Sequence, residues 1–373
     1  MNRTRSGPWP RCAGLRLAIL GIVLMAGTVA CRRQPADTSP AMAGATHPTG
    51  ILRSTVPPGT DGNAIYDRED ATRQIEAFIR QNPGGIADGL RGTYGQMVPG
   101  ADSTFFLPRG EPFRGEFFLH SGREHAHGYG LLCLLDYLQV PCSPGADHFQ
   151  SHEGVAFGDA VMVPITVTVT GKGLHDLLVM FQEDPFLPGP AGYDSFQDRT
   201  LPNVRFARAS LSVEGSVAAP EGAYIQGDRR PADDGRLPGF VPSDLAEPRG
   251  AGPTRGWIIW TETRAPAGGM LDFYLHVGRE EEHRYGVVAF VDFEQVPIHH
   301  GGEVHTPLYV HSPAGEWRSM PVSIPVPAEP GEYELRILTV GEPFARLDTL
   351  TLAEQDALSP YPHSSARVLL RVE

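Results

Sequence analysis

The chain lacks the signatures of the familiar enzymes and has almost no lysine. P-loop, dinucleotide-binding, zinc-protease, nucleophile-elbow and paired CxxC patterns do not occur in a supporting context, which argues weakly against a familiar enzyme. Lys172 is its one lysine, and the net charge of −13 at pH 7 argues against nucleic acid as a partner. The 373 residues include 43 glycines and 35 prolines, which excludes one long helical assembly and suits two cores joined by turns.

The apolar run near the N-terminus is too short to cross a membrane comfortably. Leu17–Ala30 holds fourteen residues and follows four arginines, whereas a spanning helix needs about 20 apolar residues. A basic start followed by a short apolar stretch is typical of a signal peptide. The sequence therefore predicts a signal peptide over residues 1–30 and an exported protein.

Cys31 directly follows Thr28, Val29 and Ala30, a placement that resembles the lipobox of bacterial lipoproteins. The resemblance implies that Cys31 becomes the acylated first residue of the mature protein, which anchors it stably to a membrane. Arg32 in the next position, where no Asp stands, implies sorting to the outer membrane of a Gram-negative cell. Thr28 replaces the usual Leu, so cleavage after Ala30 and simple secretion is the alternative.

The next segments predict a tether and then one helix. Residues 31–63 are rich in Pro, Thr, Ala and Gly without a hydrophobic period, as in a flexible tether. A helix is predicted over Asp67–Gln81, where Ile75, Phe78 and Ile79 fall near one stripe. We expect residues 64–99 to be a helical segment that packs on the first folded domain.

An internal repeat fixes the architecture. Phe117–Pro141 aligns without a gap with Phe273–Pro297, and 13 of the 25 positions are identical, where roughly one or two are expected by chance. Residues 184–186 and 207–214 recur as 342–344 and 366–373, so each copy is one complete domain. The shared residues of the first copy are Phe117, Leu119, His120, Gly122, Arg123, Glu124, His127, Tyr129, Gly130, Asp136, Gln139, Val140 and Pro141.

Each copy is predicted to be an antiparallel β-sandwich. Residues 165–169 and 322–326 alternate apolar and polar side chains, as half-buried strands do, while the continuously apolar Val287–Val291 predicts a central strand. Seven or eight short strands with Gly- and Pro-rich turns in about 115 residues favour two packed sheets. The predicted class is all-β, with two tandem sandwiches and one short N-terminal helix.

The strand order, with Tyr333 opening a late strand after Pro330-Gly331-Glu332, resembles immunoglobulin-like modules of the fibronectin type III or bacterial cell-adhesion-related kind. The resemblance covers residues 100–215 and 256–373 and implies two immunoglobulin-like β-sandwiches. Residues 216–255, rich in Pro, Gly, Asp and Arg, are then the linker. His175 replaces the tyrosine in the first copy, so no tyrosine corner is expected there.

Two cysteines predict a cross-strand disulfide in the first copy. Cys133 and Cys142 stand at equal distances from a turn centred on Tyr137-Leu138, which places them on opposed positions of a hairpin. Their equivalents in the second copy change together, to Ala289 and Ile298, as expected for the loss of a bonded pair. Two buried thiols are the alternative, and free-thiol titration separates the two cases.

Histidines and acids gather in particular loops of both copies. In an immunoglobulin-like topology these loops lie at one end, so we expect their side chains to converge. Imidazoles and carboxylates together suit zinc or a similar metal, and an open position would activate water. The alternative is that these groups lie on solvated loops. The candidate ligands are His125, His127, His148, His152, His283, His299 and His300, near the acids Glu124, Asp147 and residues 280–282.

The other residues shared by the copies are given structural roles. The shared Arg and Glu are expected to form an ion pair at the turn of each copy. The two shared tyrosines are expected at strand starts, half buried. As an alternative to metal binding, the shared histidines, at 120/276 and 127/283, are expected to hold the turn by hydrogen bonds. These residues are His120, Arg123, Glu124, Tyr129, His276, Arg279, Glu280 and Tyr285.

Two functions from different classes remain open. The first is a noncatalytic lipoprotein of the cell envelope, without a cofactor, that binds a protein or glycan partner or acts as a spacer and faces the periplasm or the cell surface. The second is a metal-binding protein or metal-dependent enzyme that uses the His- and Glu-rich loops. Analogy with sandwich domains of exported bacterial proteins favours the first.

Overall fold

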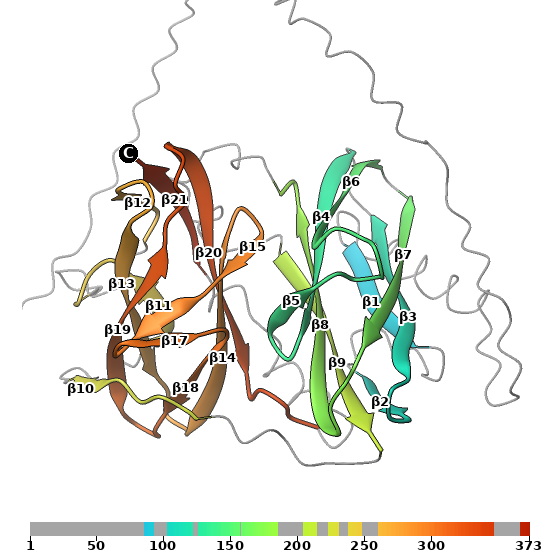
Figure 1. Ribbon diagram of the computed structural model, residues 1–373, viewed down its shortest axis with the longest axis horizontal. Helices are drawn as coiled ribbons and strands as arrows, with labels where there is room; N and C mark the ends of the chain where they lie inside the picture. The colour runs from blue at the N-terminus through green and yellow to red at the C-terminus, as the bar shows by residue number, and fades with distance from the viewer. Residues whose placement is uncertain are drawn as a thin grey trace, which may run out of the picture. The chain divides into compact units, whose positions relative to one another are not determined.

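The computed structural model describes residues 86–92, 103–121, 126–156, 158–185, 204–214, 223–230, 238–247, 260–346 and 366–373. These residues form strands and turns, arranged as two β-sandwiches that belong to one compact unit of the chain (Figure 1). Within these ranges there is no helix long and apolar enough to cross a membrane. The all-β class predicted from the sequence is confirmed.

The first sandwich pairs a three-stranded sheet with a six-stranded one. The smaller sheet has the order β1-β3-β7, and the larger has the order β2-β9-β8-β4-β5, with β6 also paired to β4 (Figure 1). Neighbours are antiparallel except β2 and β9, which are parallel. The strands are β1 (Ile86–Gly92), β2 (Ser103–Leu107), β3 (Pro112–Ser121), β4 (His127–Leu135), β5 (Leu138–Val140), β6 (Phe149–Val155), β7 (Ala160–Thr168), β8 (Gly173–Glu183) and β9 (Val204–Val213).

The second sandwich repeats this plan with more strands. One sheet has the order β11-β13-β19-β16-β17, with β10 on β19, and the other has the order β12-β21-β20-β14-β15, with β18 on β14. The strands are β10 (Asp228–Arg230), β11 (Gly239–Ser243), β12 (Glu262–Ala265), β13 (Met270–Gly278), β14 (His283–Val291), β15 (Glu294–Val296), β16 (Ile298–His300), β17 (Glu303–His305), β18 (Leu308–Ser312), β19 (Trp317–Pro325), β20 (Gly331–Gly341) and β21 (Ala366–Val372).

Three hydrophobic clusters explain the patterns of the strands. One fills each sandwich, and a third joins residues of the two copies, among them Leu132 and Leu134 from β4 and Val288 and Phe290 from β14. Successive side chains of a strand point to opposite faces. β4 and β14 are therefore continuously apolar because one face lies on its own core and the other lies against the second copy.

The domain boundaries differ from those expected. β1 lies before residue 100 and pairs along its whole length with β3, so the first sandwich begins earlier than predicted. β10 and β11 lie in the expected linker 216–255, yet they pair with β19 and β13 of the second sandwich. The composition of these segments resembles a linker because the strands are short and flanked by Gly and Pro. The helix predicted over 67–81, the tether and the signal peptide lie outside the described residues.

The first copy contains a disulfide between Cys133 and Cys142, with 5.2 Å between their Cα atoms. The hairpin register differs from the one expected. Cys133 lies opposite Val140, because the turn is formed by Asp136 and Tyr137 rather than centred one residue later. Cys142 thus follows the end of β5 and joins it back to β4.

Candidate functional site

One set of polar contacts between the copies lies where the hairpins β4–β5 and β14–β15 meet. The shared glutamines Gln139 and Gln295 bond to each other reciprocally. The backbone N–H of each donates to the side-chain Oε1 of the other, at 2.6 and 2.8 Å. Each Nε2 also donates across the joint, to the carbonyl oxygens of Phe293 (2.8 Å) and Tyr137 (2.7 Å). This reciprocal pattern is that of an isologous interface, formed here within one chain.

The turns of these two hairpins have the backbone conformation that favours glycine, but they contain none. Asp136 and Tyr137 have φ angles of 52° and 67°, and Asp292 and Phe293 have 47° and 69°. Two positive φ angles in a two-residue turn suit the right-handed twist of a hairpin, although each costs a non-glycine residue about 1–2 kcal/mol. The contacts of Tyr137 and Phe293 across the joint offset this strain.

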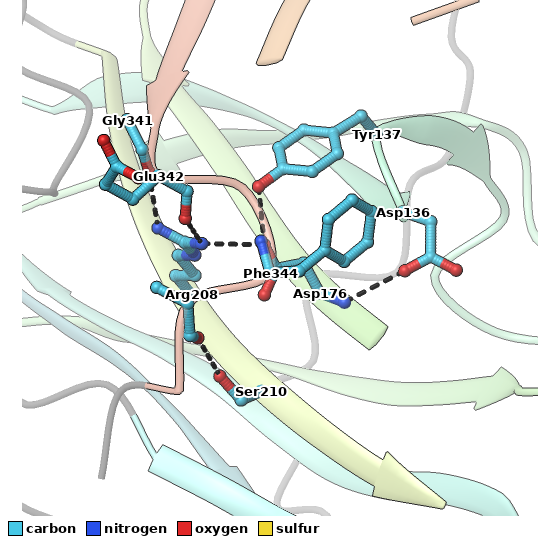
Figure 2. Close-up of polar contacts among 9 residues, drawn as sticks. Asp136, Tyr137, Asp176, Arg208, Ser210, Gly341, Glu342 and Phe344 are labelled. Atoms are coloured by element: carbon cyan, nitrogen blue, oxygen red, sulfur yellow. Dashed lines mark hydrogen bonds and ion pairs between the residues drawn. The ribbon is translucent and has the colours of Figure 1, made fainter. Parts of the chain in front are cut away.

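A buried acid, Asp176 on β8, organises the first copy's side of the joint (Figure 2). Its Oδ2 accepts hydrogen bonds from the Tyr137 hydroxyl (2.5 Å), from Arg208 Nη2 (2.7 Å) and from the backbone N of Phe344 in the second copy (2.7 Å). Arg208 also donates to the carbonyl oxygens of Gly341 (3.0 Å) and Glu342 (2.8 Å). One ion pair therefore holds a strand end of the other sandwich.

The second copy keeps an acid and an arginine at the corresponding positions and adds a second arginine. Glu334 on β20 forms ion pairs with Arg336 (2.5 Å) and Arg367 (2.7 Å). Arg336 is 1% exposed and reaches the first copy, where its Nε donates to Gln182 Oε1 at 3.0 Å. Its guanidinium also lies over the ring of Phe293, 3.6 Å from the centroid, in a cation–π contact.

Aromatic rings fill the rest of the joint. Tyr137 is fully buried, and its ring meets Phe344 edge to face at 5.6 Å between centroids. Burial raises the pKa of Tyr137 well above its ordinary value. The ring packs against Gly286, where an added Cβ would lie 3.3 Å from it. This contact explains why a glycine suits the repeated position in the second copy.

Away from the joint, His127, Glu183 and Asp184 are the one group of three metal-type ligands that the described residues bring within 4.8 Å of one another. His127 Nδ1 lies 2.7 Å from Asp184 Oδ2 and 3.4 Å from Glu183 Oε1. Asp184 Oδ1 also accepts the backbone N–H of Gly128 at 2.9 Å. One imidazole and two carboxylates form a mixed nitrogen and oxygen donor set of the kind that zinc accepts.

The second copy repeats only part of this group. His283 Nδ1 lies 3.3 Å from Glu342 Oε1, which accepts the N–H of Arg284 as Asp184 accepts that of Gly128. Gly341 stands opposite Tyr285, as Glu183 stands opposite Tyr129, so the second carboxylate is missing. The shared feature is a histidine and an acid that hold a strand end by hydrogen bonds. This agrees with the interpretation in which the shared histidines hold the turn and bind no metal.

The other predicted ligands do not converge with this group within the described residues. His148 is exposed, and His152 lies on β6 opposite Tyr129, where burial lowers its pKa. His299 and His300 lie on β16, in the sheet that does not contain His283. Among the described residues these histidines belong to no group of three metal-type ligands, so the expected convergence is not seen there. His125 lies outside the described residues, as do Arg123 and Glu124.

The shared turn residues are more buried than expected. Tyr129 and Tyr285 are each 2% exposed, and burial raises the pKa of Tyr285 to about 12. Arg279 and Glu280 form no ion pair among the described residues, and the charge of Arg279 acts on Tyr285 instead. The expected pair is therefore absent in the second copy, and its counterpart in the first copy lies outside the described residues.

His276 is fully buried on β13, while its equivalent His120 on β3 is half-buried. Burial lowers the pKa of His276 to about 4. Its Nε2 donates to the carbonyl oxygen of Leu245 at 3.0 Å. The side chain thereby fixes the segment after β11.

Sequence reasoning missed Asp176, Arg208 and Arg336, which hold the joint. Their signal was a charged residue inside an otherwise apolar strand, because such residues are almost never buried without a partner. Arg208 also falls within the repeated segment 207–214, where its equivalent is Arg367. Both clues were present, but neither indicates which surface the charge meets.

No protein-family model matches the chain, and no curated protein matches it in sequence. Distant solved structures include a family 123 glycoside hydrolase from Clostridium perfringens, with 11% identity over 31% of this chain and 23% of that chain at a TM-score of 0.21. A C. elegans MSP family member, WR4, has 13% identity over 30% of this chain and 92% of its own, at a TM-score of 0.20.

A third neighbour is the Escherichia coli alpha-2-macroglobulin activated by porcine elastase, with 10% identity over 78% of this chain and 22% of that chain at a TM-score of 0.21. The chain spans less than a quarter of the length of the hydrolase and of the macroglobulin. Likenesses at these scores carry no functional argument.

Proposed function

We propose that the protein is a noncatalytic binding module of the cell envelope, anchored by lipid on Cys31 and presenting two joined sandwiches to a protein or glycan partner. The observation that carries the proposal is the use of the repeated residues. Gln139 and Gln295 form the joint between the copies, and His127 and His283 hold strand ends. The residues common to both copies thus serve architecture.

The joint supports a rigid module. It combines a third hydrophobic cluster with the buried charges of Asp176, Arg208 and Arg336. Buried ion pairs contribute little net stability, but breaking one is costly. This cost disfavours alternative arrangements of the two copies. Two sandwiches held in this way present their outer surfaces at a fixed separation, which suits a spacer or a two-surface binding module better than two freely moving domains.

The anchor is tested by labelling cells with a fatty-acid analogue. Wild-type protein is expected to take up the label and to sediment with the outer membrane. Cys31→Ser is expected to abolish the label and release the protein. Label-free wild-type protein that is cleaved after Ala30 would instead support simple secretion.

The binding role is tested with the mature chain carrying Cys31→Ser, immobilised and exposed separately to envelope proteins and envelope polysaccharides. A saturable partner that is competed by free mature protein supports the proposal. Absence of saturable binding in both fractions would contradict it, as would turnover of a substrate by the purified protein.

The group of His127, Glu183 and Asp184 favours a second candidate function, metal binding in the first copy only. The observation specific to it is the third ligand, Glu183, which the second copy lacks. Elemental analysis and zinc titration of protein purified without a His-tag test it, with Glu183→Gln and His127→Ala as variants. Stoichiometric metal that both variants lose supports this function, and a metal-free protein with no zinc uptake rejects it.

A further inference from the structure

The outer face of the β11-β13-β19-β16-β17 sheet carries a shallow groove of about 750 Å³. Asp272 and Tyr274 of β13, Ser323 of β19 and His299 and His300 of β16 line it. The groove lies away from the joint and from the His127 group, which belong to other sheets. None of the roles assigned above uses these side chains.

The strand register sets the polar side chains in one row. Asp272 lies opposite Ser323, Ser323 opposite His299, and His299 opposite Val304 of β17. Directly opposed residues of a sheet share a face, and their sequence neighbours face the other way. The neighbours Leu271, Phe273, Val322, Ile324 and Ile298 are buried in the core, so the row points outward. A carboxylate, a hydroxyl and an imidazole thus stand in line across three strands.

The rim of the groove is built by a hairpin of the second copy. β16 and β17 are joined by Gly301 and Gly302, whose φ angles of 61° and 87° require glycine or strain. His300 is fixed there, because its Nδ1 donates to the carbonyl oxygen of Pro321 at 2.8 Å. In the first copy the chain after β5 runs instead into Cys142, the disulfide and a turn. The groove is therefore a feature of the second copy.

Apolar surface flanks the polar row. Met270 is 41% exposed and Val304 is 60% exposed, and the half-buried ring of Tyr274 lies one row further along β13. An apolar peptide or helix would leave the carboxylate, hydroxyl and imidazole without partners, which is unfavourable. A phosphate or nucleic acid would meet Asp272 and a chain of net charge −13.

We propose that this groove binds an oligosaccharide. A pyranose offers apolar C–H faces to Tyr274 and to the flanking Met270 and Val304, and it offers hydroxyls that both donate to Asp272 and accept from a serine or histidine. The inference rests on the proposed binding function and names the partner class. The shared chemistry is an uncharged oligosaccharide of hexoses or N-acetylhexosamines.

The test uses the mature chain with Cys31→Ser and two uncharged probes, N-acetylglucosamine oligosaccharides and neutral hexose oligosaccharides, in calorimetric titration. Binding to one identifies the class of sugar. Asp272→Ala and Tyr274→Ala are expected to weaken it at least about tenfold. Tyr274→Phe, which keeps the ring, is expected to stay within about threefold of the wild type.

Glu116→Ala is the matched control, because Glu116 stands before Phe117 on β3 as Asp272 stands before Phe273 on β13. It is expected to bind as the wild type does. Binding of neither probe overturns the inference, as does an equal loss in the Glu116 and Asp272 variants. If Asp272→Ala still retains the envelope partner while neither glycan binds, the binding function stands and the glycan inference alone fails.

Discussion

The two copies share one reciprocal contact where they meet, and they differ in a disulfide and in added strands. Gln139 and Gln295 make equivalent bonds, while the disulfide of the first copy has Ala289 and Ile298 at the corresponding positions in the second. The second copy instead adds β10, β16 and β17 to the sheet around β19. The comparison separates what the joint requires from what each copy has acquired on its own.

The charged residues at the joint also divide into shared and copy-specific ones. In both copies the acid on the late strand accepts an arginine of the last strand, in the pairs Asp176–Arg208 and Glu334–Arg367 at 2.7 Å each. Only the second copy adds Arg336, where the first has Leu178 in its apolar strand. A duplicated interface has thus become asymmetric, with one cation reaching across from each side by a different route.

The largest effect is expected from Arg208→Met. The change leaves the carboxylate of Asp176 buried without its guanidinium, which costs about 3–5 kcal/mol of unfolding free energy. Arg367→Met is expected to cost less, because Glu334 retains Arg336. Urea unfolding of both variants measures the difference. An equal or reversed order would show that the two acids are not distinguished by their number of partners.

Acid is expected to destabilise the second copy through His276. Its pKa is about 4 in the folded protein, against about 6.5 in an unfolded chain. The unfolded state therefore binds more protons between these values, so stability is complete above about pH 6.5 and falls as the pH approaches 4. The loss is on the order of 3 kcal/mol.

His276→Gln keeps a donor for the carbonyl oxygen of Leu245 and removes the titration, so it is expected to flatten the curve of unfolding free energy against pH. His283, whose pKa burial also lowers to about 4, contributes a separate share that this variant retains. An unchanged pH dependence in His276→Gln would contradict the assignment.

The disulfide is expected to stabilise the first copy by a smaller amount. Closing a loop of sequence separation 9 corresponds to about 2–3 kcal/mol. Cys133→Ser with Cys142→Ser is expected to lower the unfolding free energy by this amount, and reductant should then have no further effect. Titration of the unfolded, unreduced mature chain with Cys31→Ser is expected to find no reactive thiol. Two reactive thiols would contradict the bond.

The repeat, the all-β class and the cysteine pair were predictable from the sequence because each rests on local pattern or spacing. The hairpin register was not. Asp136 suits the first position of such a turn, but Tyr137 takes a positive φ angle where glycine normally stands, so the local signal was incomplete. The conformation is held by contacts of Tyr137 with Asp176 in its own copy and with Gln295 in the other.

The joint itself was hidden for a related reason. A continuous apolar pattern shows that both faces of a strand are buried. The pattern is the same whether the second face packs within one domain or against another domain. Val287–Val291 therefore indicates burial but not the partner surface. His127 was a candidate ligand, but its partners Glu183 and Asp184 were missed because they lie 56 and 57 residues away, and only the pairing of β4 with β8 brings them together.

The smallest effects are expected at the glutamines, where the symmetry of the joint is tested most directly. Gln139→Ala and Gln295→Ala should each lower the unfolding free energy by about 1–2 kcal/mol, and by similar amounts, because each removes equivalent bonds. The double variant should cost less than the sum, because the first change already loosens the joint that the bonds of the second glutamine span. Additive effects, or a loss at one glutamine alone, would mean that the reciprocal exchange does not act as a unit and that the asymmetric arginines hold the copies together.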